Sequence, residues 1–218
     1  LWLQQNYHFE PAVKLVLPDV PPMLQALSPK LPYDLLKDLV PIVQIGAGGV
    51  FLAVAPSFPA KTLREFVDAI LAAPDRYSYG SWGVGSSGHL IMEGLKARTG
   101  MRIQHVPYKT TSQIQQDLQS GALHVGWSDM TSALPLLRGN RIRALAVTGR
   151  QRAPASGDIP TMAEQGFGFD IDGWYAMLAP AATPAAIVTR VNAAVNRVMQ
   201  TPEWGERLLQ LNIPNANP

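Results

Sequence analysis

The sequence contains no cysteine, and this absence excludes thiol catalysis, a disulfide scaffold and zinc sites with cysteine ligands. It also lacks an apolar run approaching the roughly 18–20 residues of a membrane-spanning helix. The start of the chain, LWLQQNYHFE, lacks the basic and then apolar stretches of a signal peptide. A chain without cysteine is compatible with an oxidising compartment. These absences remove thiol chemistry and cysteine-bound metal from the functions to be considered.

Charged residues are also scarce, at 16% of the 218 residues, and the formal net charge is only +2. No cluster of lysine and arginine runs along one expected element, so nucleic-acid binding has little electrostatic support. Hydrophobic residues make up 47% of the chain, which is an ordinary balance for a folded globular protein. The length allows one large domain or two small ones, with a substantial buried core.

From residue 50 onward, apolar runs typical of strands alternate with amphipathic runs typical of helices. The continuous apolar run VFLAVAP (50–56) is typical of a buried parallel strand. The alternation predicts an α/β fold with a mostly parallel sheet and right-handed crossovers. Strands are expected at 14–18, 50–56, 77–81, 103–108, 123–129, 142–149 and 169–180, and helices at 57–74, 89–100, 111–121, 131–140 (broken at Pro135), 159–166 and 183–212 (divided at Thr201–Pro202).

A glycine- and serine-rich turn, GVGSSG (83–88), follows the expected strand at 77–81 and opens a helix. Such a turn aims free backbone N–H groups and the positive end of a helix dipole at one point, which attracts a phosphate or a carboxylate. A dinucleotide site also needs an acidic residue about 20 positions on, and IQHVPYKT (103–110) has none. No lysine follows the glycines as a P-loop requires, and neither Ser86 nor Ser87 has the flanking glycines of a nucleophile elbow. The turn therefore indicates an anion site.

Two further polar segments follow expected strands, PYKTTS (107–112) and WSDMTS (127–132). Because ligands collect at the carboxyl ends of parallel strands, these segments and the glycine-rich turn are expected at one edge of the sheet. Asp129 would either cap the following helix or accept hydrogen bonds from a ligand amine or hydroxyl. Lys109 is either a surface lysine or a ligand contact.

The spacing of the histidines supports neither a metal site nor a catalytic triad. The four histidines are His8, His89, His105 and His124, and no two of them have the i, i+4 spacing of a helical metal site. His105 and His124 favour core or edge positions on strands. His89, one residue past the glycine-rich turn, is either a ligand contact or a capping or packing residue. Ser86, His105 and Asp129 form a triad only on paper, because nothing in their spacing supports it. No metal and no cofactor is expected.

The chain resembles the Bug-type substrate-binding proteins of tripartite tricarboxylate transporters in an ordered set of motifs: YGSWGVGSSGHL, HVPYK, LHVGWSD, ALPLLRGNRIRALAVTGRQRAPASGDIPTMAEQG and WYAMLAPAATP. The similarity extends upstream through KLPYDLLKDLVPI and VAPSFPAKTLREFVDA, and it covers roughly residues 14–213. The resemblance implies a periplasmic, non-enzymatic receptor of the type II periplasmic-binding-protein class, with two α/β lobes around a cleft. The implied partners are a small carboxylated solute and the membrane permease subunits of the transporter, and no nucleic acid.

Members of this family hold di- and tricarboxylates, acidic amino acids and aromatic acids. Backbone amides, hydroxyl groups and ordered water typically fix the ligand carboxylate. Carried over position by position, the resemblance implies these ligand-binding residues: Ser81, Gly83, Gly85, Ser86 and Ser87 in the turn, Pro107, Tyr108 and Lys109 after the next strand, and Asp129. It implies no catalytic residue.

The chain departs from the family's pattern at several places. Thr110 stands where glycine is usual, and LPDVPP (17–22) replaces a strand that runs into a ligand loop, with Asp19 placed to repel a carboxylate. The first strand and its glycine-rich loop have no counterpart, and the chain stops at NIPNANP before the family's last helix. We therefore expect one complete α/β ligand-binding lobe at 52–172, and a second, truncated lobe at 1–51 and 173–218.

Three functions remain open at this point. The first is an extracytoplasmic receptor for a small carboxylate. The second is a truncated remnant of such a receptor that binds no solute, which the missing N-terminal loop favours. The third is an α/β enzyme that uses the glycine-rich loop, and it requires a bound nucleotide or turnover.

Overall fold

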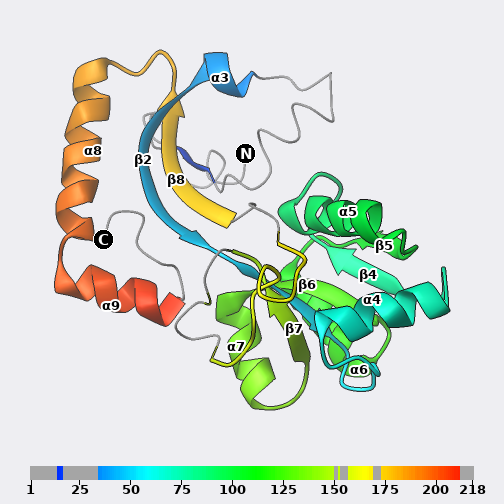
Figure 1. Ribbon diagram of the computed structural model, residues 1–218. Coiled ribbons are helices and arrows are strands. Elements are labelled where there is room, and N and C mark those ends of the chain that lie inside the picture. Colours follow the sequence, from blue (N-terminus) through cyan, green and yellow to red (C-terminus); the bar gives the residue numbers. More distant parts are fainter. Residues whose placement is uncertain (1–13, 17–33, 150–151, 153–156, 169–172, 212–218) are drawn as a thin grey trace. The chain divides into compact units, whose positions relative to one another are not determined.

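The computed structural model describes residues 14–16, 34–149, 152, 157–168 and 173–211 (Figure 1). These residues divide into two compact units. The described residues up to Gly46 form the smaller unit with Trp174–Glu206, and Ala47–Gly173 forms the larger unit with the described residues after Glu206. All three polar segments belong to the larger unit. That the lobe at 52–172 is complete as a ligand-binding lobe stays a prediction.

The larger unit contains a five-stranded sheet in the order β5-β4-β6-β3-β7. Its strands are β3 (Val50–Val54), β4 (Ser78–Ser81), β5 (Gln104–Pro107), β6 (Val125–Asp129) and β7 (Arg143–Val147). β4 pairs in parallel with both β5 and β6, whereas β3 pairs antiparallel with β6 and with β7. β3 therefore runs against the other strands of a sheet that otherwise points one way.

The strand β3 corrects one prediction. All its residues are buried, as the apolar run predicts, but the strand is antiparallel to both of its neighbours. A strand covered on both faces is apolar whichever way it runs, because burial sets the pattern and direction does not. The apolar run at 50–56 therefore predicted a buried strand correctly and its direction wrongly.

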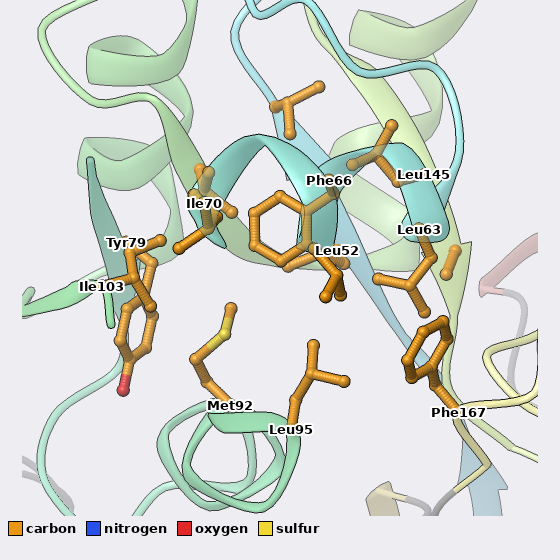
Figure 2. Packing of buried hydrophobic residues seen from close by; sticks show 14 of the residues in the cluster. Leu52, Leu63, Phe66, Ile70, Tyr79, Met92, Leu95, Ile103, Leu145 and Phe167 are labelled. Atoms are coloured by element: carbon orange, nitrogen blue, oxygen red, sulfur yellow. The ribbon is translucent and has the colours of Figure 1, made fainter. Parts of the chain in front are cut away.

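Helices cover both faces of this sheet, and alternate residues of β3 divide between two cores. Leu52 and Val54 share a core with α4 (Leu63–Ala72) and α5 (Ser87–Thr99). Phe51 and Ala53 share the other core with α6 (Thr111–Ser120) and α7 (Met130–Arg138). Figure 2 shows the first core, where side chains of α4 and α5 close over Leu52.

Two local predictions fail for identifiable reasons. The segment 159–166 makes turns instead of the predicted helix. Thr161 and Glu164 exchange the two hydrogen bonds of a capping box, at 2.6 and 3.0 Å, as at the start of a helix. Gly166 then takes a left-handed φ of 83°, which ends the helical turn before a second one can form. The predicted break at Pro135 is also wrong, because α7 continues through it and is buried on both sides of it.

The smaller unit has a three-stranded sheet in the order β1-β8-β2. The smaller unit contains β1 (Lys14–Val16), α3 (Leu35–Asp38) and α8 (Ala185–Met199), together with β2 (Leu39–Gly48) up to Gly46, β8 (Gly173–Pro180) from Trp174 and α9 (Pro202–Leu211) up to Glu206. Asn192 Nδ2 of α8 donates to the Ile42 carbonyl oxygen at 2.5 Å, beside a core that includes Val43 and Ala179. The predicted division of the two last helices at Thr201–Pro202 is confirmed, whereas LPDVPP and Asp19 lie outside the described residues.

Candidate functional site

The three polar segments meet at one edge of the five-stranded sheet. Parallel pairing of β4 with β5 and with β6 places the carboxyl ends of these strands on the same side. Ser81 lies beside Pro107 in register, and Tyr108 N–H donates to the Ser81 carbonyl oxygen at 2.9 Å. Trp82 Nε1 of the first segment donates to Thr111 Oγ1 of the second at 2.6 Å. The predicted gathering of these segments is confirmed.

A helix follows each of the three strands, α7 directly and α5 and α6 after a short loop, so the N-termini of all three helices lie at this edge. Each first turn is capped by a side chain that accepts a backbone N–H three positions on: Ser86 on α5, Thr110 on α6 and Asp129 on α7. The two hydroxyl caps are neutral and leave the positive end of the helix dipole uncompensated, whereas Asp129 brings a negative charge. The edge therefore favours an anion near α5 and α6, and a hydrogen-bond donor or cation near α7.

The turn before α5 rests on two glycines in the left-handed region, Gly83 with a φ of 114° and Gly85 with a φ of 83°. Ser86 Oγ donates to the Gly83 carbonyl oxygen at 2.8 Å and lies 3.2 Å from Ser81 Oγ. Ser81, Ser86 and Ser87 are all buried, whereas Val84 at the tip of the turn is 62% exposed. The hydroxyl groups of Ser81 and Ser86 therefore brace the turn from within.

The expectation of free backbone N–H groups in this turn is wrong for three of them. Gly83 N–H donates to Ser81 Oγ at 3.3 Å, Gly85 N–H to His89 Nδ1 at 3.2 Å, and Ser86 N–H to the Gly83 carbonyl oxygen at 3.3 Å. Glycines allow the turn to fold back on itself, and that folding consumes its own donors. For an anion, the turn therefore offers mainly the helix dipole and a fixed shape in place of these three donors.

The segment after β5 is held from the side of α6. Tyr108 Oη donates to Asp117 Oδ2 at 2.6 Å, and burial together with this bond raises the pKa of Tyr108 to about 12. Pro107 and Lys109 are exposed. The side chain of Tyr108 thus links the end of β5 to α6. Lys109 contributes an exposed positive charge near the carboxyl ends of the strands.

Asp129 realises the capping role that the sequence left open. Its Oδ1 accepts the Ser132 N–H at 2.9 Å and its Oδ2 accepts the Ser132 hydroxyl at 2.6 Å. Gln115 Nε2 extends the network by donating to Ser128 Oγ at 2.6 Å and to Ser132 Oγ at 2.7 Å. Each carboxylate oxygen keeps a second lone pair, so the capping role leaves Asp129 able to accept a further bond.

Two histidines lie against the turn, and sequence reasoning missed the contact of His105 with Ser81. His105 Nε2 lies 2.7 Å from Ser81 Oγ, and the His89 and His105 rings lie 4.4 Å apart between centroids. Ser86, His105 and Asp129 do not form a catalytic triad, because His105 contacts Ser81 and Asp129 caps α7. One signal was available: Tyr79, Ser81 and His105 fall on one face once β4 and β5 are paired in parallel.

The surroundings of this pair keep His105 neutral. Burial and the adjacent His89 lower the pKa of His105 to about 4, and the Tyr79 ring stacks on it at 4.8 Å. Burial acts to raise the pKa of the Glu93 carboxyl, but hydrogen bonds from Lys96 and Tyr79 outweigh it and lower this pKa. The bonds from Lys96 Nζ measure 2.7 and 3.0 Å.

Among the residues that the structure describes, no three histidine, cysteine, aspartate or glutamate side chains gather in a way that would hold a metal ion. Within the same residues, no helix combines the length and apolar character needed to cross a membrane.

Comparison with known families gives a match over residues 14–218 to the model described as "Tripartite tricarboxylate transporter family receptor". The description is that of a receptor and not of an enzyme, as the sequence predicts. A protein encoded in the tcbD–tcbE intergenic region of Pseudomonas sp. strain P51 is 33% identical over 190 residues, which are 86% of this chain and 56% of that protein. BugT of Bordetella pertussis is 30% identical over 81% of this chain and 54% of its own length. The chain thus spans about half the length of these relatives.

Solved structures confirm the predicted type II periplasmic-binding-protein fold. A periplasmic transporter is 31% identical with a TM-score of 0.84, over 94% of this chain and 69% of that one. A Rhodopseudomonas palustris protein with adipate is 32% identical with a TM-score of 0.78, over 84% of this chain and 62% of that one. MatC from the same organism, with bound malate, is 29% identical with a TM-score of 0.80, over 90% of this chain and 67% of that one.

Proposed function

This chain belongs to the family of tripartite tricarboxylate transporter receptors, and from that premise we propose that it is an extracytoplasmic receptor for a small carboxylate. The observation that carries the proposal is the pair of helix N-termini, α5 and α6, that begin with neutral hydroxyl caps at the carboxyl edge of the sheet. A carboxylate at such a place gains about 0.3–1 kcal/mol from each helix dipole. The adipate and malate in similar proteins support the same ligand class.

The proposed ligand contacts are the residues expected from the sequence, with roles set by their surroundings. A carboxylate sits against Gly83, Gly85 and the first turn of α5 at Ser86 and Ser87, while Ser81 supports the turn from below. On the other side of the site, Asp129 accepts a hydrogen bond from a hydroxyl or amine of the solute. Pro107 and Tyr108 shape the wall between them, and Lys109 attracts anions at longer range.

The proposed setting is the periplasm, where the loaded receptor presents its solute to the permease subunits of a tripartite transporter. The chain spans 56% and 54% of two relatives, so carboxylate binding is to be measured on this chain itself.

The experiment is a thermal-shift panel of di- and tricarboxylates, acidic amino acids and aromatic acids, followed by calorimetry of any that bind. At a concentration of 100 times its Kd, a ligand stabilises the folded protein by about 2.7 kcal/mol, which is well within reach of the assay. We expect at least one carboxylate to raise the melting temperature. If none does so while relatives respond to the same panel, the proposed function of this chain is refuted.

A matched pair of variants locates the site. Ser86→Ala and Thr62→Ala each remove a hydroxyl N-cap, at a cost of about 1 kcal/mol. Thr62 caps α4, which follows β3. Because β3 runs antiparallel to its neighbours, α4 begins at the amino ends of the parallel strands, away from the proposed site. Both variants should lower stability to a similar degree, but only Ser86→Ala should weaken carboxylate binding. Equal binding by the two variants would place the carboxylate elsewhere.

A further inference from the structure

Two imidazole rings hold the glycine-rich turn, and each does so through a different nitrogen. His89 Nδ1 accepts the Gly85 N–H at 3.2 Å, and His105 Nε2 lies 2.7 Å from Ser81 Oγ. The backbone of His89 also donates to Ser86 Oγ at 3.3 Å, so the turn is held at both of its ends. These contacts link the turn to α5 through His89, and link the end of β4 to β5 through His105.

The donor at Gly85 sets where the His89 ring carries its proton. A backbone N–H only donates, so His89 Nδ1 must offer its lone pair to Gly85, and its proton sits on Nε2, 4.0 Å from Glu93 Oε1. Ser81 Oγ accepts the Gly83 N–H at 3.3 Å, and its own hydrogen can go to the Gly83 carbonyl oxygen at 3.2 Å or to His105 Nε2 at 2.7 Å. His89 thus acts as an acceptor toward the turn, and His105 bonds to Ser81 through Nε2 as acceptor or donor according to its tautomer.

We propose that His89 and His105 are positioning residues of the carboxylate site, each holding the turn at 83–87 in its binding geometry through one ring nitrogen, His89 by its bond to Gly85 and His105 through Ser81. The inference rests on the proposed carboxylate site, but not on which solute occupies it. A turn that loses one of these contacts samples other shapes before binding. Ordering it again upon binding then lowers the affinity.

The charged and titratable groups that face the two rings are Tyr79 from β4 and Glu93 and Lys96 from α5. Lys96 and Tyr79 both bond to Glu93, so this carboxylate has partners other than the two rings. Burial and the adjacent His89 lower the pKa of His105 to about 4, which keeps its ring neutral across the neutral range.

Asparagine and glutamine variants distinguish positioning from general packing. An asparagine side-chain oxygen is as many bonds from the backbone as Nδ1, and a glutamine oxygen as many as Nε2. His89→Asn should therefore rescue the contact to Gly85, whereas His89→Gln should lose it. At His105 the order is reversed: His105→Gln should rescue the contact to Ser81, and His105→Asn should lose it.

The first readout needs no ligand. Amide hydrogen exchange at Gly85, followed by NMR, should be about 3- to 10-fold faster in His89→Gln than in wild type, and within about twofold of wild type in His89→Asn. Urea unfolding of all variants confirms that each is folded under the exchange conditions. Equal exchange at Gly85 in the asparagine and glutamine variants would overturn the proposal.

The second readout uses the carboxylate from the panel that stabilises the wild-type protein most. Its Kd should rise about 3- to 10-fold in His89→Gln and His105→Asn, and stay within about twofold in the two rescuing variants. A Kd that depends on the position but not on the choice of amide would show that the rings only fill space. If no carboxylate binds the wild type, the proposed function fails, and the exchange rates at Gly85 decide the inference by themselves.

Discussion

Replacement of Gly88 by alanine tests how closely α5 must approach β6 for the site to form. A Cβ built on Gly88 lies 2.7 Å from both Cγ and Cδ1 of Trp127 and 3.0 Å from its Cβ. Cβ contacts below 3.0 Å are essentially never found, so either the helix or the ring must move. Trp127 is 0% exposed and cannot turn into solvent, which leaves displacement of the α5 N-terminus as the easier response.

The magnitude follows from two opposing effects. Forcing an extra methyl group into a packed core costs about 1–3 kcal/mol. Alanine in place of glycine in a helix returns up to about 1 kcal/mol. The net loss therefore lies between about 0 and 3 kcal/mol. A loss of about 1–2 kcal/mol, near the middle of this range, lowers the melting temperature by roughly 2–8 °C for a chain of this length. Because α5 carries the turn at 83–87, carboxylate binding should weaken as well.

Urea unfolding followed by tryptophan fluorescence measures the effect, and Gly205→Ala is the control. Gly205 lies within α9, where an added Cβ meets nothing within 4 Å, so alanine there should stabilise the protein by up to about 1 kcal/mol. The two glycine-to-alanine changes are thus expected to have opposite signs. A Gly88→Ala protein that is as stable as Gly205→Ala, with unchanged carboxylate binding, would refute the reasoning.

Three further predictions concern other parts of the larger unit. The pKa of His105 in the folded protein, about 4, lies below the ordinary histidine pKa of about 6.5. The unfolded chain therefore binds this proton first as the pH falls, and stability should decrease between pH 6.5 and 4, by at most about 1.4 kcal/mol per pH unit before solvent screening. Urea titrations at pH 7 and 4.5 check this, and an equal decrease in His105→Gln would contradict it. Tyr108→Phe removes the bond to Asp117 and should lower stability by about 1 kcal/mol in thermal unfolding, whereas an unchanged melting temperature would mean that the bond contributes nothing. Gly126→Ala places a Cβ 2.5 Å from Ile114 Cγ2 and should cost about 1–3 kcal/mol; a double-mutant cycle with Ile114→Ala should recover part of that loss, and strict additivity would exclude the clash.

The parts of the site that depend on local signals were predictable from the sequence. The strand, turn and helix at 77–100 are confirmed as β4 and α5, and Gly100 takes the left-handed C-cap conformation with a φ of 72°. These features follow from glycine positions, helix caps and apolar periodicity within about 20 residues. The gathering of the three polar segments was predictable as well, because strand–helix alternation implies parallel neighbours.

The remaining features depend on contacts between residues far apart in the chain. Periodicity cannot give the direction of β3, since its pattern reports burial alone. The contact of His105 with Ser81 requires knowing that β4 and β5 are neighbours and in which register. The use of three N–H groups inside the turn depends in part on the orientation of the His89 side chain. Whether the nine residues predicted from the family bind a ligand stays a prediction.

The reversed direction of β3 has a consequence for the order in which the chain can fold. β3 occupies an interior position of the sheet, but its partners come much later in the chain: Val54 pairs with Val125, and Phe51 pairs with Val147. During synthesis this apolar segment emerges long before anything can cover its edges, and loop closure over such distances is slow. The parallel strands β4, β5 and β6, in contrast, are joined by short helical crossovers and can pair first. Folding would then end with insertion of β3 between β6 and β7, after the polar segments that follow β4, β5 and β6 have already come together.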